Sequence, residues 1–279
     1  MRACVLISPL VALASCATVG EKGRDGTVND AAAPKGRAVL IVADEWKQLE
    51  PLAEFLRTEG DFDVRRIDQK DLGEGLSAYH AVFMYIHGPF NTAAEKALID
   101  YATGGGRLVV LHHGIASARV RNPDWLRMAG IAIAPRDDPK RPWRVIAQTT
   151  HTLVNLQPNH YITSHKVTYD RTVEYASSDC PGAPAKLPAI DLPNTEVFVN
   201  QQFTDGQEKT VLFGSTCTDP QTGRTVMQDR GGWYKPAGRG RLFYLQPGHA
   251  ESDFRNRNYC QIILNCLTWE GPAKGPSAR

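Results

Sequence analysis

The pattern of apolar and polar positions from residue 37 onwards alternates between short apolar runs and amphipathic stretches. Residues 37–43 (RAVLIVA) form the uninterrupted apolar run of a strand that is buried on both faces. Residues 46–58 carry leucine and phenylalanine at helical spacing. Continuing along the chain, we expect strands at 62–67, 80–86 and 107–111 and a helix at 92–102. Strands that alternate with helices predict an α/β fold, a mostly parallel sheet with helices on both faces.

The second half of the chain has fewer helical patterns. Further strands are predicted at 143–148, 196–200, 210–214 and 241–245, followed by a terminal helix at 255–269. The proline-rich residues 181–193 indicate a surface excursion. Trp233 and Tyr234 follow two glycines and are expected in a loop, where they either stack on a ligand ring or anchor the loop by packing.

The N-terminus has the pattern of a bacterial export signal. A charged start precedes an apolar run at residues 5–13 that is too short to span a membrane. Leu13-Ala14-Ser15-Cys16 resembles a lipobox, so we expect residues 1–15 to be removed and Cys16 to carry lipid. The alternative is an ordinary signal peptide that is cut elsewhere. The small, polar residues 16–36 suit a flexible tether, residues 37–270 would form the domain, and residues 271–279 a disordered tail.

Composition and charge narrow the class of protein. The 279 residues are 42% hydrophobic and 22% charged, enough for one large domain with a real core. A formal net charge of +2 without a basic cluster gives no electrostatic footprint for nucleic acid. We therefore expect a protein of the bacterial cell envelope, facing the periplasm and held at the membrane only through its N-terminal lipid.

Four cysteines remain after signal removal and lipidation, in a compartment that is expected to be oxidising. Cys260 and Cys266 lie about 9 Å apart along a predicted helix and on different faces, too far for a disulfide. We therefore predict a Cys180–Cys217 bridge, with the two helix cysteines as buried thiols. The alternative pairs each of the other two cysteines with a helix cysteine.

Four of the eight histidines follow predicted strands: His87, His112, His113 and His249. Ligands of open α/β sheets gather beyond the carboxyl ends of the strands, so these positions are the first candidates for a site.

Two segments that contain these histidines resemble the trehalose-utilisation (ThuA-like) family. They are GGGRLVVLHHG at 104–114 and GRGRLFYLQPGH at 238–249, in the family's order, and the resemblance spans nearly all of residues 37–270. It implies the flavodoxin-like, doubly wound architecture of class I glutamine amidotransferase domains and a role in carbohydrate metabolism. The family's mid-chain Asp-Glu pair before a tyrosine has its nearest counterpart here in Glu174-Tyr175.

The amidotransferases that share this architecture need a cysteine at the sharp turn after the strand, because a thiolate attacks the glutamine amide. His112 occupies that position here. We therefore expect no glutaminase activity.

The strand-end histidines predict acid–base chemistry. A neutral imidazole at His112, beside a helix N-terminus, could act as a base, with His249 as acid or carbonyl polariser. His87 and His113 are expected at the rim of the substrate pocket, and Glu251 beside His249 as an orienting group. Together with a carboxylate the histidines could instead hold a zinc-like ion, but no close-spaced metal motif is present, so no metal ligand is assigned.

Three functions remain open at this stage. The first is an enzyme, a hydrolase, lyase or isomerase, that abstracts a proton beside the carbonyl of a disaccharide or keto-sugar. The second is a non-catalytic sugar-binding lipoprotein that uses Trp233 and Tyr234. The third is an envelope scaffold with a vestigial pocket. Each has a small-molecule carbohydrate or no ligand as its partner, and the oligomeric state is left open.

Overall fold

The computed structural model describes residues 37–116, 122–140, 142–177, 179, 183–206 and 209–271. The predicted signal peptide, Cys16, the tether and residues 272–279 of the predicted tail lie outside these residues. In the described part of the chain no helix is long and apolar enough to cross a membrane.

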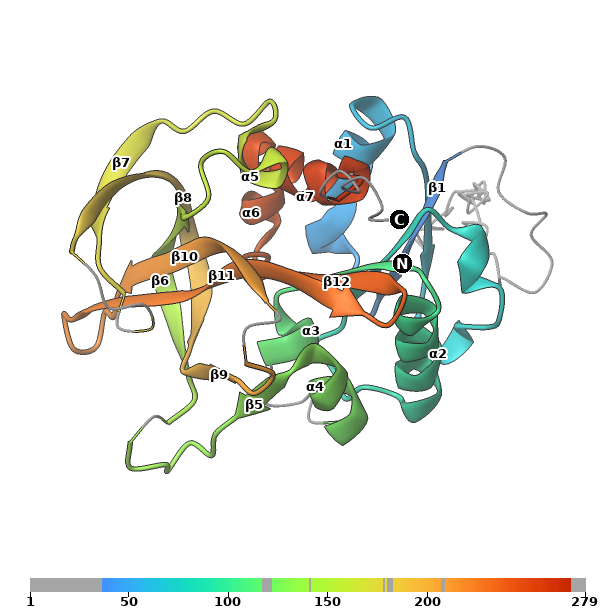
Figure 1. The fold of residues 1–279 in the computed structure, drawn as a ribbon, viewed down its shortest axis with the longest axis horizontal. Helices are drawn as coiled ribbons and strands as arrows, with labels where there is room; N and C mark the ends of the chain where they lie inside the picture. Colours follow the sequence, from blue (N-terminus) through green and yellow to red (C-terminus); the bar gives the residue numbers. More distant parts are fainter. Residues whose placement is uncertain are drawn as a thin grey trace, which may run out of the picture.

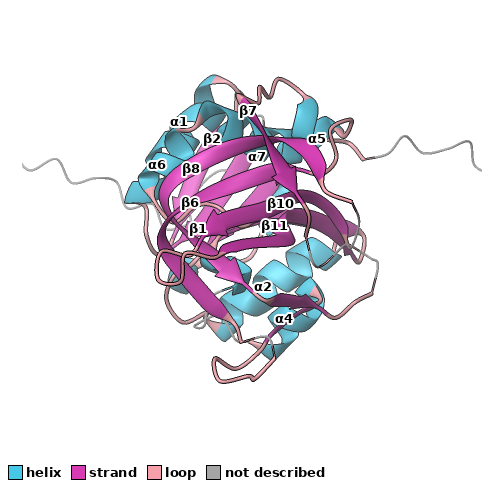
Figure 2. Ribbon diagram, turned by 90° about the vertical axis from the view of Figure 1, so that its left-hand side faces the viewer, coloured by secondary structure: helices cyan, strands magenta, loops and turns pink. Residues whose placement is uncertain are grey.

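The described residues form one mixed sheet of ten strands, in the order β2-β1-β3-β4-β12-β11-β10-β6-β8-β7. The first five strands of this order are parallel. Their bounds are β1 Ala38–Ala43, β2 Asp63–Ile67, β3 Ala81–Tyr85, β4 Arg107–Leu111 and β12 Gly240–Leu245. Helices cover both faces of this parallel half (Figures 1 and 2).

The alternating side chains of β1 show why helices are needed on both faces. Val39 and Ile41 pack into one core cluster, with α1 (Glu50–Thr58), α6 (Glu251–Arg255) and α7 (Arg257–Thr268). Leu40 and Val42 pack into the other, with α2 (Thr92–Thr103) and α4 (Pro123–Ala129). An apolar run of this kind is stable only when both faces are covered.

The other half of the sheet is antiparallel. It consists of β11 (Thr225–Ala237), β10 (Thr210–Thr218), β6 (Arg144–Asn155), β8 (Ala185–Val199) and β7 (Arg171–Tyr175). A small second sheet pairs β5 (Ile131–Ile133) with β9 (Gln201–Phe203). The remaining elements are short: α3 (His113–Ala116), α5 (Tyr161–Ser164), η2 (Lys47–Leu49), η3 (Gln69–Asp71) and η4 (Leu76–Ala78).

The prediction of an α/β fold with a parallel sheet and helices on both faces holds only for the parallel half of the sheet. The strand order of this half, β2-β1-β3-β4-β12, is the order of flavodoxin-like sheets. The prediction that the whole sheet is mostly parallel is wrong, because five of its nine strand pairs are antiparallel. From β6 to β12 the strands follow one another with only the one-turn α5 between them, and such strands pair antiparallel.

The proline-rich stretch is not wholly a surface excursion, because β8 begins at Ala185. Pro188 pairs with Thr172 of the edge strand β7. Pro193 lies where the register between β6 and β8 shifts, between the pairs made by Leu192 and Thr195. Prolines are tolerated in sheets at such irregularities and near edges.

Trp233 and Tyr234 lie inside strand β11 rather than in a loop. A Cβ atom at Gly231 would come within 2.4 Å of the carbonyl oxygen of Gly214. The glycine is thus required by a close approach of two strands, although from sequence alone it indicated a turn.

The cysteines are free where the structure describes them. Cys260 and Cys266 are buried free thiols, as predicted. Cys217 is also a free, buried thiol, in β10, and its predicted partner Cys180 lies outside the described residues.

Candidate metal centre

His112 occupies a strained turn directly after β4. Its φ of +47° lies in the left-handed region, which costs a residue other than glycine about 1–3 kcal/mol. The backbone N–H of His112 still donates to the carbonyl of Leu245, so the residue continues the hydrogen bonding between β4 and β12. Backbone strain of this kind clusters at functional sites, and here it aims a fully buried imidazole toward the antiparallel half of the sheet.

The tautomer of His112 is set by Gln246. The Nδ1 atom of His112 lies 2.8 Å from the carbonyl oxygen of Gln246, which can only accept a hydrogen bond. Nδ1 therefore carries the proton, and in a neutral ring Nε2 is left as an acceptor. The side chain of Gln246 bonds both the N–H and the C=O of Phe198, so the same residue ties β8 to the histidine.

His249 reaches the same place from the end of β12. The preceding Gly248 has a φ of +134°, and a Cβ atom there would come within 2.9 Å of the ring of Phe254. This glycine allows the loop to turn sharply and place the ring of His249 5.5 Å from that of His112, measured between centroids. The two histidines that the sequence singled out for catalysis are thus neighbours.

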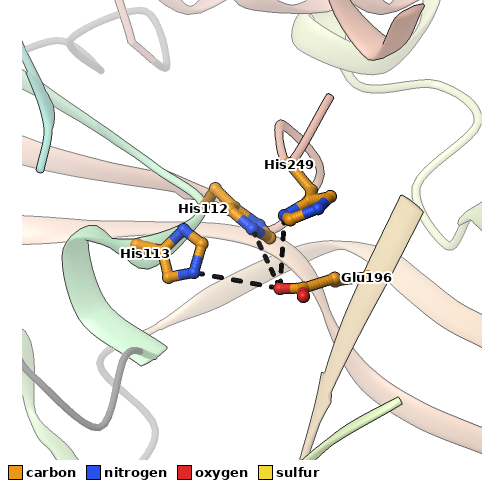
Figure 3. Close-up of side chains that lie close together, drawn as sticks. All are labelled: His112, His113, Glu196 and His249. Atoms are coloured by element: carbon orange, nitrogen blue, oxygen red, sulfur yellow. Dashed lines mark ion pairs between the residues drawn. The ribbon is translucent and has the colours of Figure 1, made fainter. Parts of the chain in front are cut away.

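The carboxylate of Glu196, from β8, lies between three histidines (Figure 3). Its Oε2 atom is 3.3 Å from Nδ1 of His249, 3.7 Å from Nε2 of His112 and 3.8 Å from Nε2 of His113. We call these four residues the His3Glu cluster. It joins both halves of the sheet, because the histidines follow parallel strands and the glutamate belongs to an antiparallel one.

Burial controls the charges of the cluster. Burial lowers the pKa of His112 and also that of His113, so both rings are neutral. Burial opposes ionisation of Glu196, but the rings of His112 and His249, 3.7 and 3.3 Å from its carboxylate, outweigh this effect and lower the pKa of the carboxyl. The carboxylate of Glu196, 3.3 Å from Nδ1 of His249, raises the pKa of His249, whose side chain is 39% exposed.

This arrangement leaves two acceptors facing each other. Nε2 of the neutral His112 and the ionised carboxylate of Glu196 have no proton between them, and His112 Nε2 has no hydrogen-bond partner among the described residues. Nδ1 of His249 lies 3.3 Å from the same carboxylate and likewise makes no hydrogen bond in that part of the chain. Opposed lone pairs in a buried site are costly unless a cation lies between them.

The cluster has the donors that a divalent transition metal prefers. One ligand atom from each of the four residues lies within 4.8 Å of the other three. The distances of 3.3 to 3.8 Å from Glu196 Oε2 are shorter than twice a metal–nitrogen bond of about 2.1 Å, so one ion could contact these atoms together. Three imidazoles and one carboxylate suit zinc, and also iron, cobalt, nickel or manganese. The contact from His112 Nδ1 to Gln246 is the kind of outer hydrogen bond that orients metal-binding histidines.

A pocket of about 510 Å³ opens beside the cluster. Its volume falls in the range of small-molecule sites. The lining residues come from both halves of the sheet and from the loops between them: Glu45, Gln48, His87, His113, Arg136, Trp143, Val145, Ala147, Glu196, Phe198 and His249. A larger cavity, of about 780 Å³, lies at the start of β4 next to Arg107, at the opposite end of that strand from His112.

His87 lies on the wall of the pocket. Its ring centroid is 4.1 Å from that of His113, and its backbone N–H donates to the carboxylate of Asp44. The ring Nδ1 of His87 is 3.8 Å from Asp44 and 3.8 Å from Glu45. His87 and His113 are therefore both close to any ligand in the pocket.

Three predicted binding residues do not line this pocket. Trp233 is fully buried in the core, against Tyr244, and cannot stack on a sugar. Tyr234 is half-buried and packs on Trp269. Glu251 begins α6 and forms an ion pair with Arg255.

Glu196 was missed from the sequence. The search for strand-end residues applies to parallel strands, whereas Glu196 lies within an antiparallel strand, where no such rule holds. The residue that motif comparison indicated, Glu174, is exposed on the edge strand β7. One feature of the sequence does indicate Glu196: it is a lone carboxylate directly before the apolar run 197–199, and carboxylates are rarely buried without a partner.

Comparisons with known proteins agree with this architecture. The family described as "ThuA: Trehalose utilisation" matches residues 39–270. A ThuA-like protein from Parabacteroides merdae has a similar structure, with a TM-score of 0.58 and 14% identity over 87% of this chain and 94% of its own. A ThuA-like protein from Bacteroides uniformis has a TM-score of 0.52 and 14% identity over 85% of this chain and 92% of its own. No curated protein sequence matches.

Proposed function

The chain belongs to the ThuA (trehalose utilisation) family, and on that premise we propose that it is a carbohydrate-modifying enzyme with a divalent metal ion in the His3Glu cluster. The observation that carries the proposal is the convergence of His112, His113, His249 and Glu196 at the wall of a substrate-sized pocket. The family's carbohydrate-related role supplies the substrate class.

In this proposal His112 and His249 bind a metal ion, whereas the sequence suggested that these two histidines act as a base and an acid. His112 is fully buried and its Nδ1 proton is committed to Gln246, so its free Nε2 acts as a ligand. A bound ion would polarise a hydroxyl or carbonyl oxygen of the sugar as a Lewis acid. The substrate would be a disaccharide or a keto-sugar, and the reaction a hydrolysis, elimination or isomerisation beside that oxygen.

The binding of the sugar itself falls to the pocket wall. The carboxylate of Glu45 and the amide of Gln48, which donates to it over 2.8 Å, can exchange hydrogen bonds with sugar hydroxyls. The ring of His87 lies beside these groups, 3.8 Å from Glu45. These side chains would orient the substrate relative to the ion.

The alternatives lose their support. A sugar-binding lipoprotein with Trp233 and Tyr234 as stacking platforms lacks a platform, because Trp233 is buried in the core. Glutaminase activity finds no support, since none of the cysteines that the structure describes, 217, 260 and 266, lines the pocket. A scaffold with a vestigial pocket would not need to keep His112 in a strained conformation.

We propose in addition that lipid on Cys16 holds the domain at the membrane and that residues 16–36 separate the two. The support is the lipobox-like run LASC at residues 13–16. Expression of the full chain in a bacterial host and fractionation would test it. Wild type should be found with the membranes, and Cys16→Ser should be released. A C16S protein that still sediments with membranes would contradict the anchor.

The enzyme proposal is tested by metal analysis and turnover on one sample. Purified protein should contain about one transition-metal ion per chain by mass spectrometry, and chelation should abolish turnover of a panel of disaccharides and their keto derivatives. Glu196→Gln keeps the shape of the side chain and removes its charge. We expect it to weaken metal binding by more than about a hundredfold, beyond the effect of losing an outer-shell group.

The matched control is Glu174→Gln, which makes the same change at the exposed glutamate of β7. It should leave metal content and turnover unchanged. Metal-free protein that turns over sugars would contradict the metal proposal. Metal-loaded protein that turns over no member of the panel would contradict the proposed substrates.

A further inference from the structure

Arg136, at the pocket of the His3Glu cluster, has no acidic partner in the part of the chain that the structure describes. It lies in the connection between β5 and β6 and is the one lysine or arginine among the described residues that line this pocket. Its guanidinium forms no ion pair or hydrogen bond with another described residue. The guanidinium carbon lies 5.5 Å from the centroid of the Trp143 ring, in a cation–π contact.

The platform beneath Arg136 is rigid. Trp143 is 1% exposed and lies against Phe198, with 6.0 Å between ring centroids. Phe198 in turn stacks on His112 at 4.6 Å. A cation over a fixed indole keeps its donors directed outward at a lower entropic cost than a free side chain. Arg136 is therefore positioned relative to the cluster, although it belongs to a loop.

The charges around the pocket favour an anion once an ion is bound. A divalent ion with three neutral imidazoles and Glu196 carries a net charge of about +1, and Arg136 adds a further +1. Among the described residues that line the pocket, Glu45 is the one other carboxylate. The pocket then presents positive charge at two separate places, the ion and the guanidinium.

We infer that the pocket takes a sugar acid, whose carboxylate binds Arg136 while its hydroxyl or carbonyl oxygens face the cluster. A guanidinium presents paired N–H donors that match a carboxylate, which a neutral sugar lacks. Glu45 and Gln48 can exchange hydrogen bonds with hydroxyl groups, which a plain carboxylic acid does not offer. This inference rests on the proposed function and narrows its substrates to uronic or aldonic acids and their glycosides.

Matched ligands test the inference in the metal-loaded full-length protein. Glucuronate and glucose differ only by a carboxylate in place of a hydroxymethyl group, as do gluconate and glucitol. In each pair we expect the acid to bind at least about tenfold more tightly by calorimetry, because a charge-assisted pair is added. The advantage should shrink as ionic strength rises.

Two variants test whether the preference for the acid over the neutral sugar comes from the side chain of Arg136. Arg136→Gln should abolish the preference for the acid and leave binding of the neutral partner unchanged. Arg127→Gln, at an exposed arginine of α4 that pairs with Asp124 outside this pocket, should change neither. Equal affinities within each pair, no binding of either acid, or a preference that persists in R136Q would each overturn the inference.

Metal content measured on the same samples separates the two proposals. Protein that carries about one ion per chain but shows no preference for acids contradicts the sugar-acid inference alone. Protein that carries no ion contradicts the metal centre, and acid binding lost in R136Q would then still support the role of Arg136.

Discussion

The Oδ2 atom of Asp253 accepts a hydrogen bond of 2.7 Å from the hydroxyl of Thr195, deep inside the protein. Thr195 precedes Glu196 in β8. The same Oδ2 also accepts the backbone N–H groups of Gly248 and Ala250, which flank His249. One buried carboxylate therefore joins the two segments that carry Glu196 and His249, far apart in the sequence.

This relationship predicts that Asp253 sets the affinity for metal without contacting the ion. Asp253→Asn should weaken metal binding about 10- to 100-fold, as is typical when an outer-shell partner is lost. Thr195→Val removes a single hydrogen bond and should weaken binding less. Competition with a fluorescent chelator measures both, and a melting curve controls for unfolding. Wild-type affinity in folded D253N protein would show that the two segments are held by other contacts.

The backbone of His112 allows a second prediction, which separates its chemical role from its structural strain. His112→Ala and His112→Gly both remove the imidazole, and both should lose metal and turnover. Glycine adopts the φ of +47° without the penalty of a Cβ atom, so H112G should be about 1 kcal/mol more stable than H112A. Chemical denaturation of the two variants measures the difference. Equal stabilities would mean that the turn relaxes when the histidine is removed.

How far the sequence predicted the fold depends on the kind of strand. Buried parallel strands are apolar throughout, so the run at 107–111 predicted β4 with its observed bounds. The antiparallel half was harder because its strands carry prolines and glycines. Pro188 and Gly231 were interpreted as loop signals, yet one lies beside an edge strand and the other where two strands approach closely.

The candidate site shows a similar division. His112 and His249 could be chosen from the sequence, because both follow parallel strands whose carboxyl ends lie at one edge of the sheet. Glu196 could not, because its place beside them depends on how β8 packs against Gln246 at the end of β12, a contact between residues about fifty positions apart. Motif comparison pointed to Glu174, which the structure leaves on the surface.

Trp233 provides a third prediction. Its fully buried ring packs against Tyr244 and Phe203. Trp233→Ala should destabilise the protein by about 3–5 kcal/mol, the usual cost of a large cavity in a core, and Trp233→Phe by less. Urea denaturation measures the loss, and calorimetry on the folded variants should show unchanged sugar binding. If the Trp233→Ala protein were as stable as wild type but no longer bound sugar, Trp233 would belong to the binding site.

The charge cluster around Asp205 predicts a dependence of stability on pH. Oδ2 of Asp205 bonds the ammonium of Lys235 at 2.6 Å, its other oxygen bonds Lys209 at 2.5 Å, and both lysines are largely buried. Burial works against the ionised form of Asp205, but the hydrogen bonds from Lys209 and Lys235 outweigh it and lower its pKa.

A carboxyl whose pKa is lowered by folding stabilises the folded protein at pH values above the unfolded pKa of about 3.9. This contribution to stability is lost as the pH falls through the lower pKa of the folded state. Asp205→Asn removes the negative charge that faces two buried ammonium groups and should cost about 3–5 kcal/mol at pH 7. This gap should close as the pH falls through the lowered pKa of the wild-type carboxyl. Asp124→Asn, in an exposed pair with Arg127, should cost less than about 0.5 kcal/mol at any pH, so urea denaturation of the three proteins between pH values of about 2 and 7 tests the assignment. A D205N deficit that stays constant over this range would mean that the cost comes from packing rather than from charge.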